Sequence, residues 1–178
     1  MKTAIILYEP SQLASLSALM EKWSEGSEAP HIVSLDAEID FALEKRGIPF
    51  ISGKTLQNRA APTTYIRAEE ITSEIYTHDA LSFLTYRDVS PVEPLRFSIH
   101  VYFLRLFYYI DAIERFMESA TDVERLVVPV SVVPVSKTSD PLAVEESKIV
   151  YEAAHLVAEQ RGINCESHDM RSPALQVK

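Results

Sequence analysis

The sequence is short of cysteine and of long apolar runs, and each shortage excludes a class of protein. The one cysteine, Cys165, allows no internal disulfide, and no CxxC or paired Cys/His spacing offers a structural zinc site. A reducing compartment is therefore favoured, and we expect a cytoplasmic chain. No window reaches the roughly 18 uncharged apolar residues that a membrane span needs. The opening apolar run closes at Glu9 without a cleavage site, which indicates a strand and not a signal peptide.

Positive charge is also scarce. The chain has 17 Lys and Arg residues against 26 Asp and Glu residues, and its formal net charge is −9. An acidic surface repels nucleic-acid phosphates, and no basic run with interleaved aromatic residues compensates for it. Nucleic acid is therefore a disfavoured partner, and the residue spacings predict no metal site.

The sequence does contain enough apolar material for one domain of ordinary size. It has 178 residues, of which 47% are apolar, and a chain of this length can bury a substantial core. We expect one Rossmann-like α/β domain over residues 1–170, followed at 171–178 by a tail or the start of a linker to a second domain.

Short apolar runs alternate with amphipathic segments in the first third of the chain. This pattern predicts strands at 3–8, 31–35 and 48–51, and helices at 11–24 and 36–46. Parallel strands need crossover helices, and right-handed crossovers produce a doubly wound sheet. We therefore predict an α/β fold that is Rossmann-like and three-layered (α/β/α), with a mainly parallel sheet of about five strands.

The remaining segments are less regular. Residues 54–70 are polar and indicate a loop, and the strand predicted at 126–128 is followed by Pro129 and Pro134, which lack the N–H of an interior ladder. Further helices are predicted at 67–86, 95–117 and 141–161, and a last strand at 163–167.

The helix predicted at 95–117 is unusually aromatic and apolar nearly all round. Such a helix is buried or covers a partner. Because one sheet face cannot bury so much apolar surface, we expect this helix also to meet a second domain or subunit, with a homo-oligomer as one form. Arg96 and His100 lie four residues apart on it and are candidates for an anion contact and a cleft base. Alternatively, His100 is a hydrogen-bonded core residue and Arg96 reaches the surface.

Further candidates follow the first strand. The segment Tyr8-Glu9-Pro10-Ser11 lies where doubly wound folds place ligand contacts. Glu9 is a candidate catalytic carboxylate and Ser11 a candidate substrate contact, although both also suit a plain surface turn. The dinucleotide fingerprint GxGxxG is absent because no glycine precedes Gly26, so a Rossmann dehydrogenase is disfavoured.

The segment Ser52-Gly53-Lys54-Thr55 resembles the end of a phosphate-binding P-loop. The glycine that this motif requires is replaced by Ile48, and no helix clearly follows, so a nucleotide triphosphatase is rejected. Ser52, Lys54 and Thr55 stay candidates for contacting an anion, with a solvated turn as the alternative.

A polar loop precedes the last helix. Asp140 suits the N-cap of that helix because Pro141 follows it. The same residue is also a candidate base, and Lys137 is a candidate substrate contact.

Two stretches resemble the N-terminal half of GT-B type glycosyltransferases, including those of surface-polysaccharide synthesis. One is the opening strand–helix unit with residues 34–50, in which a helix ending in a glycine is followed by Ile-Pro-Phe; the other is 145–163. The resemblance covers most of the chain and implies the acceptor-side domain of an enzyme of glycan biosynthesis. It also implies that a second Rossmann-like domain holds the nucleotide-sugar donor, so that this domain binds no cofactor and is inactive alone. No family motif matches residue by residue, so Glu9, His100 and Asp140 are candidate bases by their predicted places only.

The residues leave another class of function open. A non-catalytic α/β module, flavodoxin-like in shape, would bind a protein partner through the aromatic helix at 95–117. A stand-alone small hydrolase or transferase is a third possibility, but no nucleophile elbow or triad is visible.

Overall fold

A computed structural model describes residues 2–24, 28–57, 61–78, 96–130 and 141–170. Its centre is a five-stranded sheet in the order β3-β2-β1-β4-β5, and all neighbouring strands in it are parallel. This is the strand order of a Rossmann-like sheet, whereas a flavodoxin-like sheet has the order 2-1-3-4-5. The prediction of a Rossmann-like α/β fold is confirmed, and the flavodoxin-like shape considered as an alternative is wrong.

The strands are β1 (Lys2–Leu7), β2 (His31–Ser34), β3 (Ile51–Ser52), β4 (Val123–Val130) and β5 (Asn164–Asp169). The two central strands, β1 and β4, carry apolar side chains on both faces, and every β1 residue after Lys2 is buried. Continuous apolar runs of this kind are what a parallel sheet covered on both faces requires.

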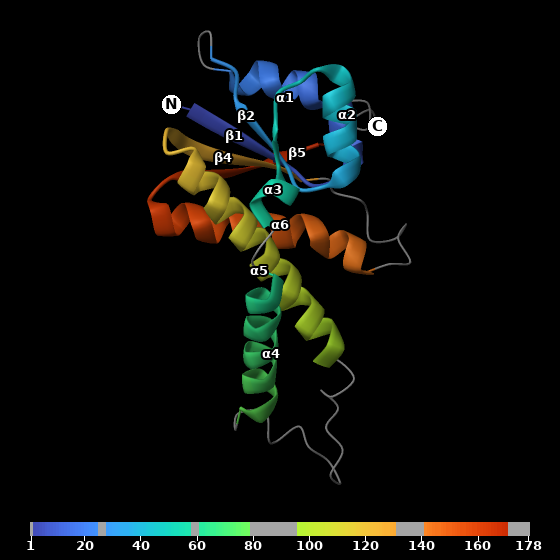
Figure 1. The fold of residues 1–178 in the computed structure, drawn as a ribbon, viewed down its shortest axis with the longest axis vertical. Coiled ribbons are helices and arrows are strands. Elements are labelled where there is room, and N and C mark those ends of the chain that lie inside the picture. The colour runs from blue at the N-terminus through green and yellow to red at the C-terminus, as the bar shows by residue number, and fades with distance from the viewer. Residues whose placement is uncertain (1, 25–27, 58–60, 79–95, 131–140, 171–178) are drawn as a thin grey trace, which may run out of the picture.

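Helices cover both faces of the sheet (Figure 1). They are the 3-10 helix η1 (Pro10–Ala14), α1 (Leu16–Trp23), α2 (Ala37–Arg46), α3 (Gly53–Gln57), α4 (Ala61–Thr77), α5 (Arg96–Ser119) and α6 (Pro141–Arg161). One core packs α1 and α2 on one face, and the other packs α5 and α6 on the opposite face. The three-layer prediction is therefore confirmed. Within the described residues, no helix combines the length and the apolar character of a membrane span.

Local signals set the ends of α2. Asp36 is its N-cap, and its Oδ1 accepts hydrogen bonds from the backbone N–H groups of Glu38 (2.7 Å) and Ile39 (3.2 Å). Gly47 ends the helix at a φ of 65°, in the left-handed region that favours glycine. Both ends agree with the predicted helix at 36–46.

The segment predicted as one helix at 11–24 forms two helices. Residues 10–14 make the tight 3-10 turn η1, and α1 begins only at Leu16. Ser11 lies within η1, and Glu9 takes the N-cap position. The break has a physical reason, because the turn carries the side chain of Gln12 under the ends of β1 and β4, where it is fully buried.

The prediction of a polar loop at 54–70 is wrong. Helix α3 follows Ser52 directly, and α4 begins at Ala61. Helix α4 rests on α5 along one side and keeps its other side exposed, so it needs few apolar residues; its buried positions include the small residues Ala68 and Thr72. It ends at Thr77, and the remainder of the helix predicted at 67–86 lies outside the described residues from residue 79 onward.

Two strands differ in length from their predictions. Strand β3 is two residues long and begins at Ile51, past Pro49, at the sheet edge. Strand β4 runs on past the predicted 126–128 and includes Pro129, which pairs with β5. This proline is tolerated because the pairing of β4 with β1 ends at Val127, so no N–H is needed beyond it on that side. Pro134 lies outside the described residues.

Helix α5 has two different surroundings. Its second half packs against the sheet beside α6, with Ile113 and Phe116 fully buried. Its first half, residues 96–105, leaves the sheet and runs antiparallel to α4 (Figure 1). We call this projecting pair, α4 with residues 96–105, the α4–α5 arm.

Candidate functional site

The carboxyl ends of β1 and β4 meet where the strand order reverses, the usual place for a ligand in an α/β sheet. The side chain of Gln12 fills this place. Its Oε1 accepts hydrogen bonds from the backbone N–H groups of Tyr8 (2.9 Å) and Glu9 (3.2 Å). Its Nε2 donates to the carbonyl of Pro129 (2.7 Å). Doubly wound nucleotide-binding domains direct N–H groups of this turn at phosphates, and here two of them are already bonded within the chain.

Sequence reasoning missed Gln12. A lone Gln in a turn has the composition of a surface residue, and polar side chains of this type are mostly exposed. The only available hint was its position, because Glu9 and Gln12 have the spacing of a reciprocal N-terminal cap, which the structure contains.

Glu9 and Ser11 lie together beside Gln12, as predicted for a strand end. Ser11 is exposed, and its Oγ donates a hydrogen bond to Oε1 of the half-buried Glu9 (2.7 Å). The arrangement orients a carboxylate at the carboxyl end of a central strand. Such a group can accept a proton from a ligand hydroxyl that comes within hydrogen-bond reach.

Ser52, Lys54 and Thr55 form a local turn at the start of α3. The Oγ of Ser52 donates to Oδ2 of Asp40 (2.5 Å) and accepts from the backbone N–H of Lys54 (3.2 Å), and Oγ1 of Thr55 donates to the carbonyl of Ser52 (2.6 Å). A Cβ at Gly53 would lie 2.9 Å from the carbonyl oxygen of Ser34, so this position requires glycine. The hydroxyls of Ser52 and Thr55 thus both donate hydrogen bonds within the chain, while Lys54 is exposed.

Arg96 and His100 lie on the α4–α5 arm, and both contact the carboxylate of Glu69 on α4. Arg96 Nη2 lies 3.0 Å from Glu69 Oε1, and His100 Nδ1 lies 3.2 Å from Glu69 Oε2. The ring of Tyr65 meets that of His100 edge to face at a centroid distance of 5.1 Å. Both predicted residues therefore face α4. Glu69 lies within the helix predicted at 67–86, but sequence reasoning missed its role because nothing local shows that this helix packs against α5.

The other two predicted residues, Lys137 and Asp140, lie outside the described residues, and α6 begins at Pro141. The predicted site residues that the structure describes thus form three separate groups, around Gln12, Asp40 and Glu69. In the described part of the chain, no group of three or more His, Cys, Asp or Glu side chains is arranged to hold a metal ion.

A further polar network joins α5 to α6. The phenol of Tyr109 donates a hydrogen bond to Oε1 of Glu146, and Arg105 Nη1 donates to Oε2 of the same carboxylate (3.1 Å). Burial raises the pKa of Tyr109, and the hydrogen bond to Glu146 raises it further. The phenol therefore stays neutral at physiological pH.

Cys165 is half-buried on β5, and burial raises the pKa of its thiol to about 12. The thiolate is the nucleophilic form of cysteine, so this environment argues against thiol chemistry at Cys165.

Comparison with known proteins adds little. No protein family matches the sequence, and no curated protein matches it significantly. One solved structure, from work on structure-guided engineering of a reductase to attenuate substrate inhibition in asymmetric catalysis, is similar at a TM-score of 0.39 and 15% identity. The match covers 95% of this chain and 57% of that one. A likeness this distant establishes neither the chemistry nor the family of the present chain.

Proposed function

We propose that this chain is the acceptor-side domain of a GT-B-like glycosyltransferase that acts in glycan biosynthesis. The nucleotide-sugar donor would be held by a second Rossmann-like domain or subunit. The observation that carries this proposal is Gln12, whose amide occupies two backbone N–H groups at the switch point. Because Gln12 occupies N–H groups that could otherwise bind a phosphate, this sheet suits a domain that leaves nucleotide binding to a partner domain.

Glu9 is the candidate general base. As the acceptor hydroxyl attacks the anomeric carbon, a new C–O bond forms and the bond to the nucleotide leaving group breaks, while the hydroxyl proton passes to the Glu9 carboxylate. Ser11 orients that carboxylate through its 2.7 Å hydrogen bond. His100 is the weaker candidate, because it faces Glu69 on the α4–α5 arm.

Binding measurements on the chain test this proposal. We expect it to bind an acceptor glycan on an array and to show no saturable binding of UDP- or GDP-sugars by calorimetry. Glu9→Gln should weaken glycan binding, whereas the matched Glu38→Gln, at an exposed position of α2, should not. Tight binding of a nucleotide-sugar, or no binding to any glycan, would contradict the proposal.

A second candidate function is a binding module that self-associates through the aromatic helix. It is favoured by the large apolar side chains that the α4–α5 arm exposes, with 76% of Phe97 and 54% each of Tyr65 and Ile66 accessible. Soluble monomers rarely gather such groups without a partner. Light scattering would then give about twice the chain mass of 20.1 kDa, and Phe97→Ser would return the monomer.

A further inference from the structure

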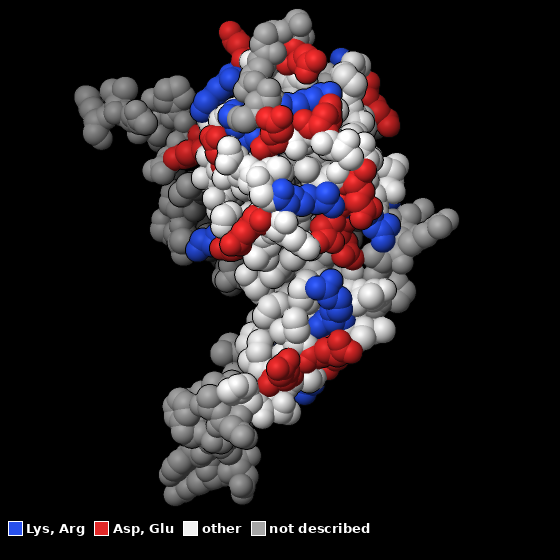
Figure 2. All heavy atoms as spheres, turned by 90° about the vertical axis from the view of Figure 1, so that its left-hand side faces the viewer, with Lys and Arg blue, Asp and Glu red and all other residues white. Residues whose placement is uncertain are grey.

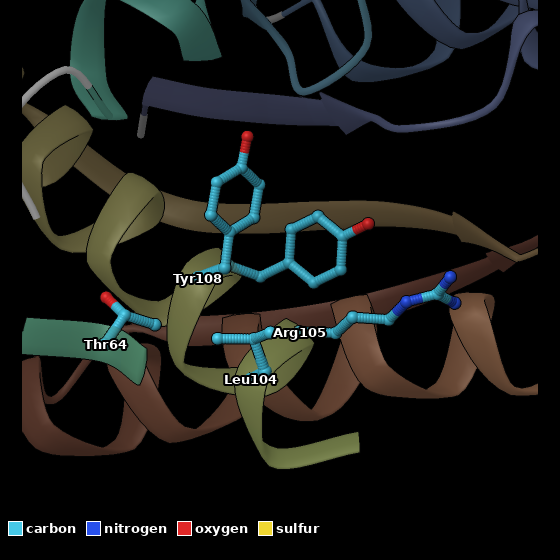
Figure 3. A pocket seen from close by; sticks show the side chains of 5 residues that line it. Thr64, Leu104, Arg105 and Tyr108 are labelled. Carbon is cyan, nitrogen blue, oxygen red and sulfur yellow. The ribbon is translucent and has the colours of Figure 1, made fainter. Parts of the chain in front are cut away.

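A pocket opens between α4 and α5. It has a volume of about 360 Å³ and is lined by Thr64, Leu104, Arg105, Tyr108 and Tyr109. Figure 3 shows that Thr64 comes from α4 and the other labelled side chains from α5, and that the Arg105 guanidinium extends away from Thr64 along α6. The walls are therefore mainly tyrosine rings, a leucine side chain and the arginine stem.

Three of the lining residues, Thr64, Arg105 and Tyr109, pair their polar groups with carboxylates beside the pocket. Thr64 Oγ1 donates to Oδ2 of Asp111 (2.8 Å). Arg105 and Tyr109 both donate to Glu146, so the positive charge of the guanidinium is balanced next to the pocket. An ionic ligand would have to disrupt these pairs and lose its own hydration, which is costly in an apolar setting. The pocket therefore favours an uncharged molecule over an anion, which would meet the carboxylates of Asp111 and Glu146 beside it.

The size of the pocket limits what can enter. Small-molecule sites have volumes of about 300–1,000 Å³ and are lined mainly by apolar and aromatic groups. A dry apolar cavity of about 150 Å³ holds one benzene ring, so 360 Å³ leaves room for a ligand of two rings. Tyrosine faces favour offset or edge-to-face contact with another aromatic ring.

We propose that this pocket binds a small, uncharged aromatic molecule of one or two rings. None of the lining residues is a candidate in the proposed sugar transfer, so this proposal does not depend on that one. It uses the junction at which the α4–α5 arm leaves the sheet, so a ligand there would contact both α4 and α5.

A fluorescent probe tests the proposal. N-phenyl-1-naphthylamine is uncharged and aromatic, and we expect it to bind saturably with one molecule per chain and a rise in fluorescence. The anionic 1-anilinonaphthalene-8-sulfonate should bind at least tenfold more weakly. Equal binding of the two probes, several sites per chain, or no saturation would overturn the proposal.

Substitutions in the pocket wall test whether the probe binds there. Leu104→Asp adds a charge to the wall and should weaken binding of the uncharged probe at least tenfold, and Tyr108→Ala, at a partly exposed position, should weaken it as well. The matched control Leu156→Asp, at a 44% exposed position on α6, should leave binding unchanged. Thermal melting checks that each variant is folded. If Leu104→Asp does not fold, Tyr108→Ala tests the location of the site by itself. Equal effects at Leu104 and Leu156, or binding that disappears as a dimer dissociates on dilution, would contradict the proposal.

Discussion

The sheet with the helices packed on its two faces, which we call the body, and the α4–α5 arm differ in how far their paired polar groups are buried. In the body, Gln12 is fully buried, and its amide joins the turn after β1 to β4 through three hydrogen bonds. In the arm, the Glu69 side chain is 43% exposed and bridges Arg96 and His100. Figure 2 shows acidic and basic side chains mixed over the surface of the body and along the described part of the arm.

This difference has an energetic consequence. A buried polar group that loses its partner costs its full desolvation penalty, whereas an exposed ion pair contributes little. Single substitutions should therefore be severe in the body and mild in the arm. The substitutions with the largest expected change in unfolding free energy test whether the body is the more stable part. Those with the smallest test whether the charges of the arm contribute to stability.

The two ends of α5 offer the sharpest contrast. Phe116 is fully buried against the sheet, and Phe97 is 76% exposed on the arm. Phe116→Ala should lower the free energy of unfolding by about 4 kcal/mol because it leaves a cavity in the core. Phe97→Ala should change it by less than about 0.5 kcal/mol. Urea denaturation measures both, and similar losses at the two positions would show that the arm is as well packed as the body.

The buried amide should come next in size. Gln12→Met keeps the shape of the side chain but leaves two N–H groups and the Pro129 carbonyl without their partner. We expect a loss of about 3 kcal/mol in unfolding free energy. The same change at exposed Gln160 of α6 is the control and should cost little. A mild effect at Gln12 would mean that water or another group replaces its amide.

The network between α5 and α6 should have an intermediate effect. Tyr109→Phe removes one donor to Glu146 while Arg105 remains, and we expect a loss of about 1.5 kcal/mol. Because the folded-state pKa of Tyr109 is raised, the neutral phenol contributes fully below about pH 10 and this contribution is lost as the pH rises further. Wild type should therefore lose stability more steeply than Tyr109→Phe above pH 10 in alkaline unfolding. Parallel curves would refute the raised pKa.

The smallest effect should come from the Arg96–Glu69 ion pair of the arm. Glu69→Gln removes the charge shared by Arg96 and His100, and because all three side chains are partly exposed we expect less than about 1 kcal/mol. The effect should shrink further in 1 M NaCl, since salt screens exposed charges. A large loss that is insensitive to salt would place Glu69 in the same class as Gln12.

Much of the fold could be predicted from the sequence because its signals are local. Five strands, the parallel sheet and the ends of α2 follow from apolar runs and from the caps Asp36 and Gly47. The prediction failed where the signal was tertiary, as in the first turns of α4, which were predicted as a loop and which pack against α5. The candidate site was predicted less well: Glu9 and Ser11 are together at a strand end, but Gln12, which organises that end, was missed.

The sequence by itself determined most of the helices and strands of this protein, since helix and strand periods and capping residues act between neighbours a few positions apart. Only the tertiary structure decided which polar groups meet. Gln12 and Pro129 are 117 residues apart, and Tyr109 and Glu146 are 37 apart. Such pairs form only after the sheet has brought distant segments together, and a fully buried polar side chain is tolerated only where that assembly supplies its partners.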